Sequence, residues 1–474
     1  MNRAGLAIGV ASFLAASNVA ARPIAPTILC ETYATSPLCV AAPPCSTCHV
    51  SENPPSWNAF GLDLGALLDD DLDDAGYAAA LPGALEAVAG KDSDGDGFDN
   101  IDELNAGSLP GDAESKPGAA GCPPDPASLD YSICVYDPRL VFKRVHRDFC
   151  GKSPSYEAYK TFVALPEAEQ KAELHAALDA CLDSEFWLGK DGVVWQMAHR
   201  KIRPVGALKG GEDAGFLPLA DYFNDYALFV YAQIDDHDAR SVLLADFFVK
   251  RTDNPTRYEV TYDQNPSGCD GQCTEPMDVD RRAGMITTRW MLLYNIMFTA
   301  LPRALAAQAY RSYLGLDIAR MEGLFPIEGE PKNYDGTGVD QEACATCHST
   351  LDPLMYPFRN YNGLTGGKRA QYVTERLEDF FEDDFPGIGA TPESGFLFGQ
   401  PVADLREWAE VAANSDEFAM ATVRDYWMLF IGRAPTAEEA DEFEALWKGL
   451  RSKNAWSVER VLADLIKTEA YGVP

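Results

Sequence analysis

Two copies of one pentapeptide constrain this chain more than any other feature. Residues 45–49 are Cys-Ser-Thr-Cys-His, and residues 344–348 are Cys-Ala-Thr-Cys-His. Two thiols at this spacing can each add to a vinyl group of one porphyrin, while the adjacent imidazole ligates the iron. We therefore predict two covalently bound haem c groups. The predicted attachment and iron-binding residues are Cys45, Cys48 and His49 for the first haem, and Cys344, Cys347 and His348 for the second.

Two other kinds of site use the C-x-x-C spacing. A thioredoxin-like dithiol lies at the end of a strand in a βαβ unit, and a zinc ribbon has a second C-x-x-C close by. The sequence around the two motifs indicates neither context, and each copy has a histidine directly after its second cysteine. Haem attachment is the favoured interpretation.

The first 21 residues have the pattern of a signal peptide. Arg3 is followed by an apolar stretch over residues 4–16 and by small residues at positions 19–21. No other segment approaches the length of apolar sequence that a transmembrane helix requires. We expect a periplasmic or extracellular protein without a membrane span, in a compartment where haem attachment and disulfides can both form.

The other cysteines support this expectation. The chain has 12 cysteines, so eight remain when the four of the two motifs are set aside. Their clustering predicts four disulfides between neighbours, although eight cysteines allow about 105 connectivities. The predicted pairs are Cys30–Cys39, Cys122–Cys134, Cys150–Cys181 and Cys269–Cys273.

The chain is strongly acidic, with 73 acidic and 39 basic residues and a formal net charge of −34. Nucleic acids and anionic membranes bind clustered lysine and arginine, so this balance argues against both as partners. A solvated acidic surface is the favoured interpretation. The alternative is electrostatic steering of a cationic redox partner protein.

Residues 92–103 have the spacing of a calcium-binding loop, with Gly97 at the position of the tight turn. Asp99 stands where a paired EF-hand usually has an aliphatic residue, so the loop resembles the dockerin or thrombospondin-repeat type more closely. We predict one Ca²⁺ with a structural role; the alternative is an acidic linker without metal. The predicted ligands are Asp92, Asp94, Asp96, the Phe98 carbonyl, Asn100 and Glu103.

An internal repeat predicts the fold class. Residues 151–157 match residues 432–438, and the match continues to Ser184-Glu185 and Thr468-Glu469. The apolar spacing in both copies is helical, so we predict a mainly α, multidomain chain. The expected segments are a signal peptide (1–21), a first haem module with the calcium loop (22–115), a linker (116–137), helical module A (138–200), a central mostly helical region (201–335), a second haem segment (336–400) and helical module B (401–474).

The second haem segment resembles a known family. Residues 343–354 contain C-x-x-C-H followed by Asp-Pro-Leu, and residues 357–363 are aromatic and rich in asparagine. This pattern and the Gly-Arg-x-Pro-Thr module resemble the large secreted cytochrome-like proteins of planctomycetes and myxobacteria, from residue 139 onward. The resemblance implies haem binding and redox work but no substrate.

The sequence does not decide the sixth ligands of the two irons. Residues 50–145 contain neither histidine nor methionine, so the first haem takes a ligand from another domain, uses an unusual ligand or keeps an open face. Met355, Met420 and Met428 are candidates for the second haem, and His146 and His199 lie in basic clusters suited to haem propionates. We predict electron transfer. The alternatives are a dihaem peroxidase or oxygenase with one five-coordinate haem, and a calcium-stabilised surface protein with structural haems.

Overall fold

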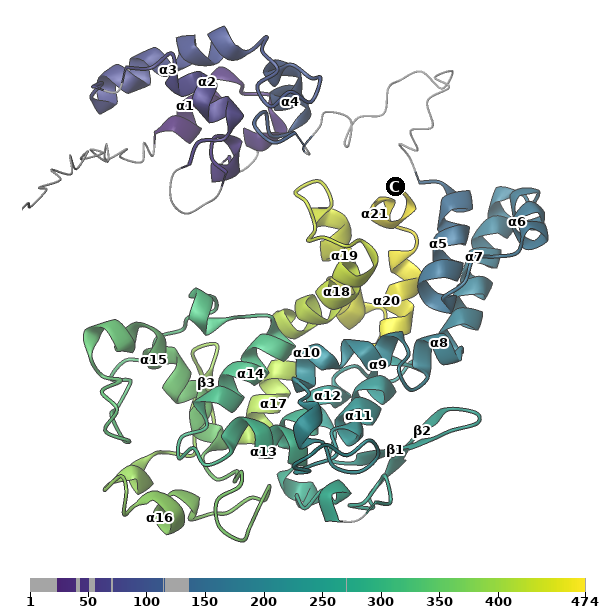
Figure 1. Cartoon of the computed structure of the whole chain (residues 1–474), viewed down its shortest axis with the longest axis vertical. Helices are drawn as coiled ribbons and strands as arrows, with labels where there is room; N and C mark the ends of the chain where they lie inside the picture. Colours follow the sequence, from purple (N-terminus) through teal and green to yellow (C-terminus); the bar gives the residue numbers. More distant parts are fainter. Residues whose placement is uncertain are drawn as a thin grey trace, which may run out of the picture. The chain divides into compact units, whose positions relative to one another are not determined.

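The computed structural model describes residues 24–39, 43–50, 56–69, 71–113, 115, 136–269 and 271–473. The chain divides into two compact units, residues 1–135 and 136–474 (Figure 1). Helices make up 52% of the described residues, which confirms the mainly α prediction. The expected signal peptide and the predicted Cys122–Cys134 pair lie outside the described residues.

Four α-helices form the described part of the first unit. They are α1 (Ala25–Thr32), α2 (Ala59–Gly65), α3 (Asp74–Val88) and α4 (Asn100–Ala106). Asn58 and Asp73 begin α2 and α3 by accepting a hydrogen bond from the backbone N–H of the third residue on, which satisfies a donor that the helix leaves unpaired. A small core of nine buried apolar residues, including Phe60 and Val88, holds the helices together.

The second unit contains the remaining α-helices and both sheets. Its helices are α5 (Pro138–Cys150), α6 (Tyr156–Val163), α7 (Glu167–Leu182), α8 (Glu185–Leu188), α9 (Val193–Met197), α10 (His199–Ile202), α11 (Phe223–Gln233), α12 (Ser241–Leu244), α13 (Arg289–Ile296), α14 (Arg303–Leu314), α15 (Glu342–Met355), α16 (Arg376–Phe381), α17 (Leu405–Ala413), α18 (Asp416–Phe430), α19 (Ala440–Ser452), α20 (Val458–Leu465) and α21 (Glu469–Gly472). Two antiparallel hairpins, β1 (Phe248–Thr252) with β2 (Arg257–Thr261) and β3 (Gly395–Leu397) with β4 (Gln400–Val402), complete it.

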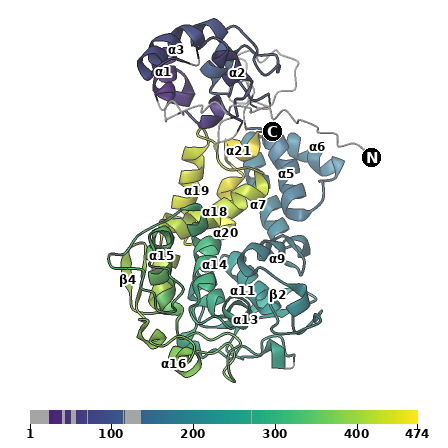
Figure 2. The same ribbon diagram turned by 60° about the vertical axis from the view of Figure 1, so that its left-hand side comes forward.

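One continuous core runs through the second unit, from Val141 to Tyr471. The four segments that the sequence separates between residues 138 and 474 therefore belong to one compact body, because their apolar faces cover one another. Helical modules A and B meet directly: Arg144 of α5 donates to the carbonyl oxygens of Phe430 and Tyr471. Both views place α5 and α7 beside α20 and α21, at the end of this unit opposite α16 (Figures 1 and 2).

The internal repeat is visible in matching helix starts. Ser184 begins α8 with its hydroxyl accepting from the Trp187 N–H, and Thr468 begins α21 by accepting from the Tyr471 N–H. These hydroxyl residues are equivalent in the two copies, so the sequence match reflects the same local structure.

Three of the four predicted disulfides are present in the structure: Cys30–Cys39, Cys150–Cys181 and Cys269–Cys273. The second of them fastens the end of α5 to α7, with the two Cα atoms 4.7 Å apart. No helix in the described part of the chain is both long and apolar enough to cross a bilayer.

Candidate functional sites

The first pentapeptide forms a tight turn that Asn58 fastens to α2. Residues Cys45–Thr47 make one 3-10 turn, and the His49 N–H donates to the Cys45 carbonyl at 2.9 Å. The Asn58 amide donates to the carbonyls of Ser46 (2.8 Å) and Thr47 (3.2 Å), and its oxygen accepts from the Gly61 N–H. One buried side chain therefore starts the helix and holds the motif.

Gly61 permits this close packing. A Cβ at this position would lie 2.2 Å from the Cys48 carbonyl oxygen and 2.6 Å from the Trp57 ring. Any other residue would push α2 away from the motif.

The His49 side chain is packed but not hydrogen-bonded through Nδ1. Its ring stacks on Trp57 with the centroids 4.5 Å apart, and Nδ1 is buried without a hydrogen-bond partner. A buried polar atom without a partner costs free energy, and such an exception needs an explanation. Trp57 therefore fixes the ring by its face, while the protein supplies no acceptor to Nδ1.

The thiols of the first motif differ in burial. Cys45 is exposed and Cys48 is half-buried. Burial, followed by the neighbouring Cys45, raises the pKa of Cys48 to about 12. At neutral pH Cys48 is a protonated thiol, whereas a reactive redox dithiol has a lowered pKa. This environment disfavours the thioredoxin-like alternative.

The second pentapeptide lies within the regular helix α15. Residues 344, 347 and 348 are three and four positions apart, so the two thiols and the imidazole share one helix face. Cys344 is exposed and Cys347 is half-buried. The Sγ atom of Cys347 lies 3.6 Å from Sδ of Met321, a methionine that sequence reasoning did not consider.

His348 is held by a buried carboxylate. Its Nδ1 lies 2.8 Å from Oδ1 of Asp352, one helical turn further along α15, and Asp352 is fully buried. Arg303 of α14 donates to both Asp352 oxygens, from Nε and Nη2, at 2.7 Å each. Its third nitrogen, Nη1, donates to Asp335. The result is a chain of four side chains, His348–Asp352–Arg303–Asp335, which we call the His348 relay.

Electrostatics keep the outer part of this relay ionised. Burial alone would lower the pKa of Arg303, but hydrogen bonds and charge from Asp352 and Asp335 outweigh it and raise the pKa above its usual value. Burial would raise the pKa of Asp335, but Arg303 holds it below the usual value. Bidentate pairing of this kind also fixes the Asp352 carboxylate plane against His348.

The four motif cysteines differ from every other described cysteine. Cys45, Cys48, Cys344 and Cys347 are free thiols, whereas the other six described cysteines are joined in three disulfides. Each free pair is followed directly by a histidine. Two thiols and a neutral imidazole are the protein groups that haem c requires, so the residues of both motifs fit that group. The relay adds a further element of fit, because an Nδ1 bonded to a carboxylate leaves Nε2 as the atom available to a metal.

The predicted calcium loop folds around Asp92. Its Oδ1 accepts from the N–H groups of Gly95 and Asp96, and its Oδ2 accepts from the Gly97 N–H at 2.9 Å. One oxygen from each of Asp92, Asp94 and Asp96 lies within 4.8 Å of the others. Gly97 has φ +101°, a backbone conformation that other residues rarely adopt.

Glu103 gives the strongest indication that this loop holds a cation. It is fully buried, and neither carboxylate oxygen has a hydrogen-bond partner; Oδ2 of Asp94 is also buried without one. Burial, then the charges of Asp94, Asp96 and Asp92, raise the pKa of Glu103 to about 8. Buried carboxylates are paired or coordinate metals, and these hard oxygen donors suit Ca²⁺.

Two other predicted ligands have additional or different contacts. The Asn100 amide nitrogen donates to the Val88 carbonyl and to the Ser93 hydroxyl, while its oxygen accepts from the Ser93 N–H. Asn100 therefore closes the loop onto α3, and its role as a calcium ligand stays a prediction. The Phe98 N–H donates to Asp96, and its side chain is exposed.

Three of the remaining candidate ligands have structural contacts. His146 bonds the Phe142 carbonyl through Nδ1, and His199 bonds the Tyr226 hydroxyl. Met355 is buried in the core and lies seven residues after His348, on the same helix face. Within the basic clusters, Arg144 bonds two carbonyls and Lys201 pairs with Asp425 at 2.7 Å. Lys143, Arg147 and Arg200 are exposed.

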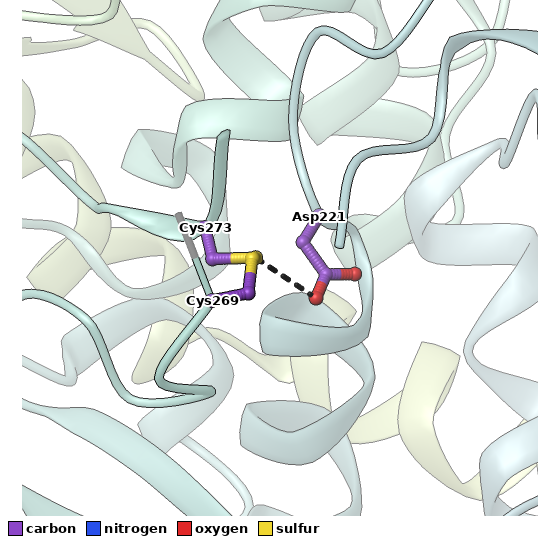
Figure 3. Close-up of side chains that lie close together, drawn as sticks. All are labelled: Asp221, Cys269 and Cys273. Carbon is purple, nitrogen blue, oxygen red and sulfur yellow. Dashed lines mark hydrogen bonds between the residues drawn. A yellow bond between two sulfur atoms is a disulfide. The ribbon is translucent and has the colours of Figure 1, made fainter. Parts of the chain in front are cut away.

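A further group of potential ligands lies at Asp221, Cys269 and Cys273 (Figure 3). Cys269 and Cys273 form a disulfide, so they offer no thiolate in this state. Asp221 is paired with Lys209 at 2.9 Å, with both side chains 2% exposed. The cluster is a buried ion pair beside a disulfide.

Comparison of the chain with family models, with curated proteins and with solved structures gives no match.

Sequence reasoning found the two motifs and the loop but missed the residues that support them. Asn58, Trp57, Arg303 and Asp335 carry no motif, and their roles depend on contacts distant in sequence. Asp352 had a usable signal: it stands four residues after His348 in a helical segment, the spacing at which two side chains meet.

Proposed function

We propose that the protein is an exported dihaem c-type cytochrome that transfers electrons. The observation that carries this proposal is the pair of free thiols, each followed by a histidine, in a chain whose other described cysteines are in disulfides. A haem at each motif supplies an iron that changes valence, and the protein sets its potential through ligands, burial and hydrogen bonds.

The residues around each motif have distinct tasks in this proposal. Asn58 holds the first attachment turn, and Trp57 fixes the plane of the His49 ring. At the second motif, α15 presents both thiols and the imidazole on one face, and Asp352 orients the imidazole. The family resemblance of residues 343–363 is consistent with these tasks.

Calcium is the second part of the proposal. The loop binds one Ca²⁺ through Asp92, Asp94, Asp96 and Glu103, and the ion stabilises the first unit. Support comes from Glu103, whose buried carboxylate lacks any hydrogen bond. The loop runs directly into α4, and the described residues of the first unit contain no second loop of this spacing, so the ion serves as a structural clamp.

A peroxidase-like activity is the second candidate function, and one observation favours it. The described residues of the first unit contain one histidine, His49, and no methionine. The first haem then keeps an open sixth position unless another part of the chain supplies a ligand. At the second motif Met321 provides a thioether beside Cys347 and is the first candidate for a sixth ligand there.

The haem stoichiometry tests the proposal directly. The full chain is produced with its signal peptide in a host that attaches haem c, and haem is counted by the pyridine haemochrome assay. We expect two haems in the parent protein and one in each of the double variants Cys45→Ser/Cys48→Ser and Cys344→Ser/Cys347→Ser. The control is Cys269→Ser/Cys273→Ser, which removes a disulfide pair and keeps two haems. A parent protein without covalent haem would contradict the proposal.

Carbon monoxide separates the two functions. Two low-spin haems whose ferrous spectra ignore carbon monoxide support electron transfer. A haem that binds carbon monoxide, present in Cys344→Ser/Cys347→Ser and absent from Cys45→Ser/Cys48→Ser, assigns an open position to the first haem and supports the peroxidase-like function. If carbon monoxide binds the second haem of the Met321→Ala variant but not that of the parent protein, Met321 is the sixth ligand of that haem.

A further inference from the structure

We propose that the His348 relay sets the reduction potential of the second haem, with Asp352 lowering the potential and Arg303 limiting that effect. The inference rests on haem attachment at Cys344 and Cys347, and it goes further by assigning a tuning role to three residues outside the motif. Asp352, Arg303 and Asp335 are positioning residues, because they act on the iron through His348.

The direct contact is the hydrogen bond between Nδ1 of His348 and the Asp352 carboxylate, at 2.8 Å. A ligating histidine that donates its other N–H to a carboxylate becomes a stronger electron donor to the metal. A stronger donor stabilises the ferric state more than the ferrous state, so the reduction potential falls. Asp352 is fully buried, which removes the competing water that would weaken this bond.

Arg303 opposes this effect through the same carboxylate. It donates to both Asp352 oxygens at 2.7 Å and shares Oδ1 with His348. The cation draws negative charge away from the oxygen that faces the imidazole. Asp335 accepts from the same guanidinium and partly neutralises it. The sign of the effect therefore alternates along the relay: Asp352 lowers the potential, Arg303 raises it and Asp335 lowers it slightly.

The first motif provides an internal contrast. Nδ1 of His49 is buried without a hydrogen-bond partner, and its ring contacts the Trp57 face instead. No described carboxylate is within hydrogen-bonding reach of that atom. The electron-donating hydrogen bond thus belongs to the second motif, and relay substitutions leave the first haem unchanged.

The experiment measures one haem at a time in the full chain. Cys45→Ser/Cys48→Ser leaves only the second haem, whose midpoint potential is followed optically in a redox titration. We expect Asp352→Asn to raise the midpoint, Asp352→Glu to restore it toward the parent value and Arg303→Gln to lower it. Asp335→Asn gives a rise smaller than that of Asp352→Asn. The opposite signs at Asp352 and Arg303 distinguish tuning from general disruption.

Asp317→Asn is the matched control. Asp317 lies on the same unit, directly before Ile318, whose carbonyl is near Cys347, and it pairs with Arg311 rather than with His348. Asp317→Asn removes a nearby negative charge without changing the relay. The small shift that it causes in the midpoint potential measures the through-space effect of one charge. If Asp352→Asn loses haem, Asp335→Asn and Arg303→Gln still test the relay.

The outcomes separate this inference from the proposed function. Absence of covalent haem in the parent overturns the proposed function. A parent with haem, in which Asp352→Asn or the milder Asp335→Asn gives no rise beyond that of Asp317→Asn, overturns the relay. Shifts of the same sign at Asp352 and Arg303 also overturn it.

Discussion

His49 and His348 follow the same sequence motif but have opposite surroundings. Nδ1 of His49 is buried without a hydrogen-bond partner, whereas Nδ1 of His348 meets Asp352, which is itself held by Arg303. The first motif thus leaves Nδ1 of its histidine unpaired, and the second pairs that atom with a carboxylate. An identical motif therefore predicts attachment at both places but not the electronic character of the attached group.

The same contrast extends to the whole units. In its described residues the first has a core of nine buried apolar residues, and its Glu103 carboxylate is buried without a hydrogen bond. The second has one core that extends from Val141 to Tyr471. Small domains cannot bury enough apolar surface and commonly depend on disulfides or metals. We infer that the first unit needs its ligands to be stable and that the second does not.

Removing calcium provides the largest expected difference between the units. Chelation of Ca²⁺ leaves the carboxylates around Glu103 uncompensated, so the first unit loses stability and the second keeps it. A ligand at one thousand times its dissociation constant contributes about 4.1 kcal/mol. Calorimetry of the full chain, with calcium and with chelator, should show one calcium-dependent transition.

Glu103→Gln checks the assignment of that transition. We expect it to abolish the dependence on calcium, because the neutral amide removes a charged ligand. Exposed Glu86 lies on α3 of the same unit, and Glu86→Gln should leave the dependence intact. Equal dependence on calcium in both transitions would contradict the contrast between the units.

Breaking the His348 relay gives the next largest effect. Asp352→Ala leaves the Arg303 guanidinium, 18% exposed, without its bidentate partner. Removing one partner of a buried ion pair costs about 3–5 kcal/mol, and the remaining contact with Asp335 places this case at the lower end. Chemical denaturation should show the loss in the second unit alone. Lys171→Ala breaks an exposed ion pair of the same unit and serves as the control. If Asp352→Ala lowered the free energy of unfolding less than Lys171→Ala, the relay would not be part of the stable core.

Asn58→Ala provides a smaller effect in the first unit. Loss of an N-cap residue costs about 1 kcal/mol, and Asn58 also holds two carbonyls of the attachment turn. We expect Asn58→Ala to lower the free energy of unfolding of the first unit by about 2 kcal/mol, measured by thermal unfolding. Ser155→Ala, which removes a simple cap from α6 of the second unit, should cost about 1 kcal/mol. Equal losses would show that Asn58 acts only as a cap.

The comparison also explains which features the sequence predicts. The helical class, the three described disulfides and the loop around Asp92 follow from local patterns such as periodicity and spacing. The single core of the second unit could not be predicted in this way, because the contacts that build it join residues distant in sequence. Arg144, for example, donates to the carbonyls of Phe430 and Tyr471. The relay was missed for the same reason: Arg303 and Asp352 belong to different helices. The role of Asn100 depends on Val88, at the end of the preceding helix.

The dependence on pH gives the finest test of the contrast. Burial raises the pKa of Glu459 in the second unit to about 7 and that of Glu103 to about 8, from an ordinary value of 4.5. A raised pKa means that the folded state favours the protonated form. The associated stability is complete below the ordinary pKa and is lost as the pH rises through the raised value. Without calcium both units should therefore lose stability above pH 4.5, up to about pH 7 for the second and about pH 8 for the first.

With saturating calcium the ionised form of Glu103 is the one that binds, so the loss should vanish from the first unit. The loss in the second unit should persist and be removed by Glu459→Gln. Unfolding profiles across this pH range, with and without calcium, would contradict the contrast if calcium changed both units alike.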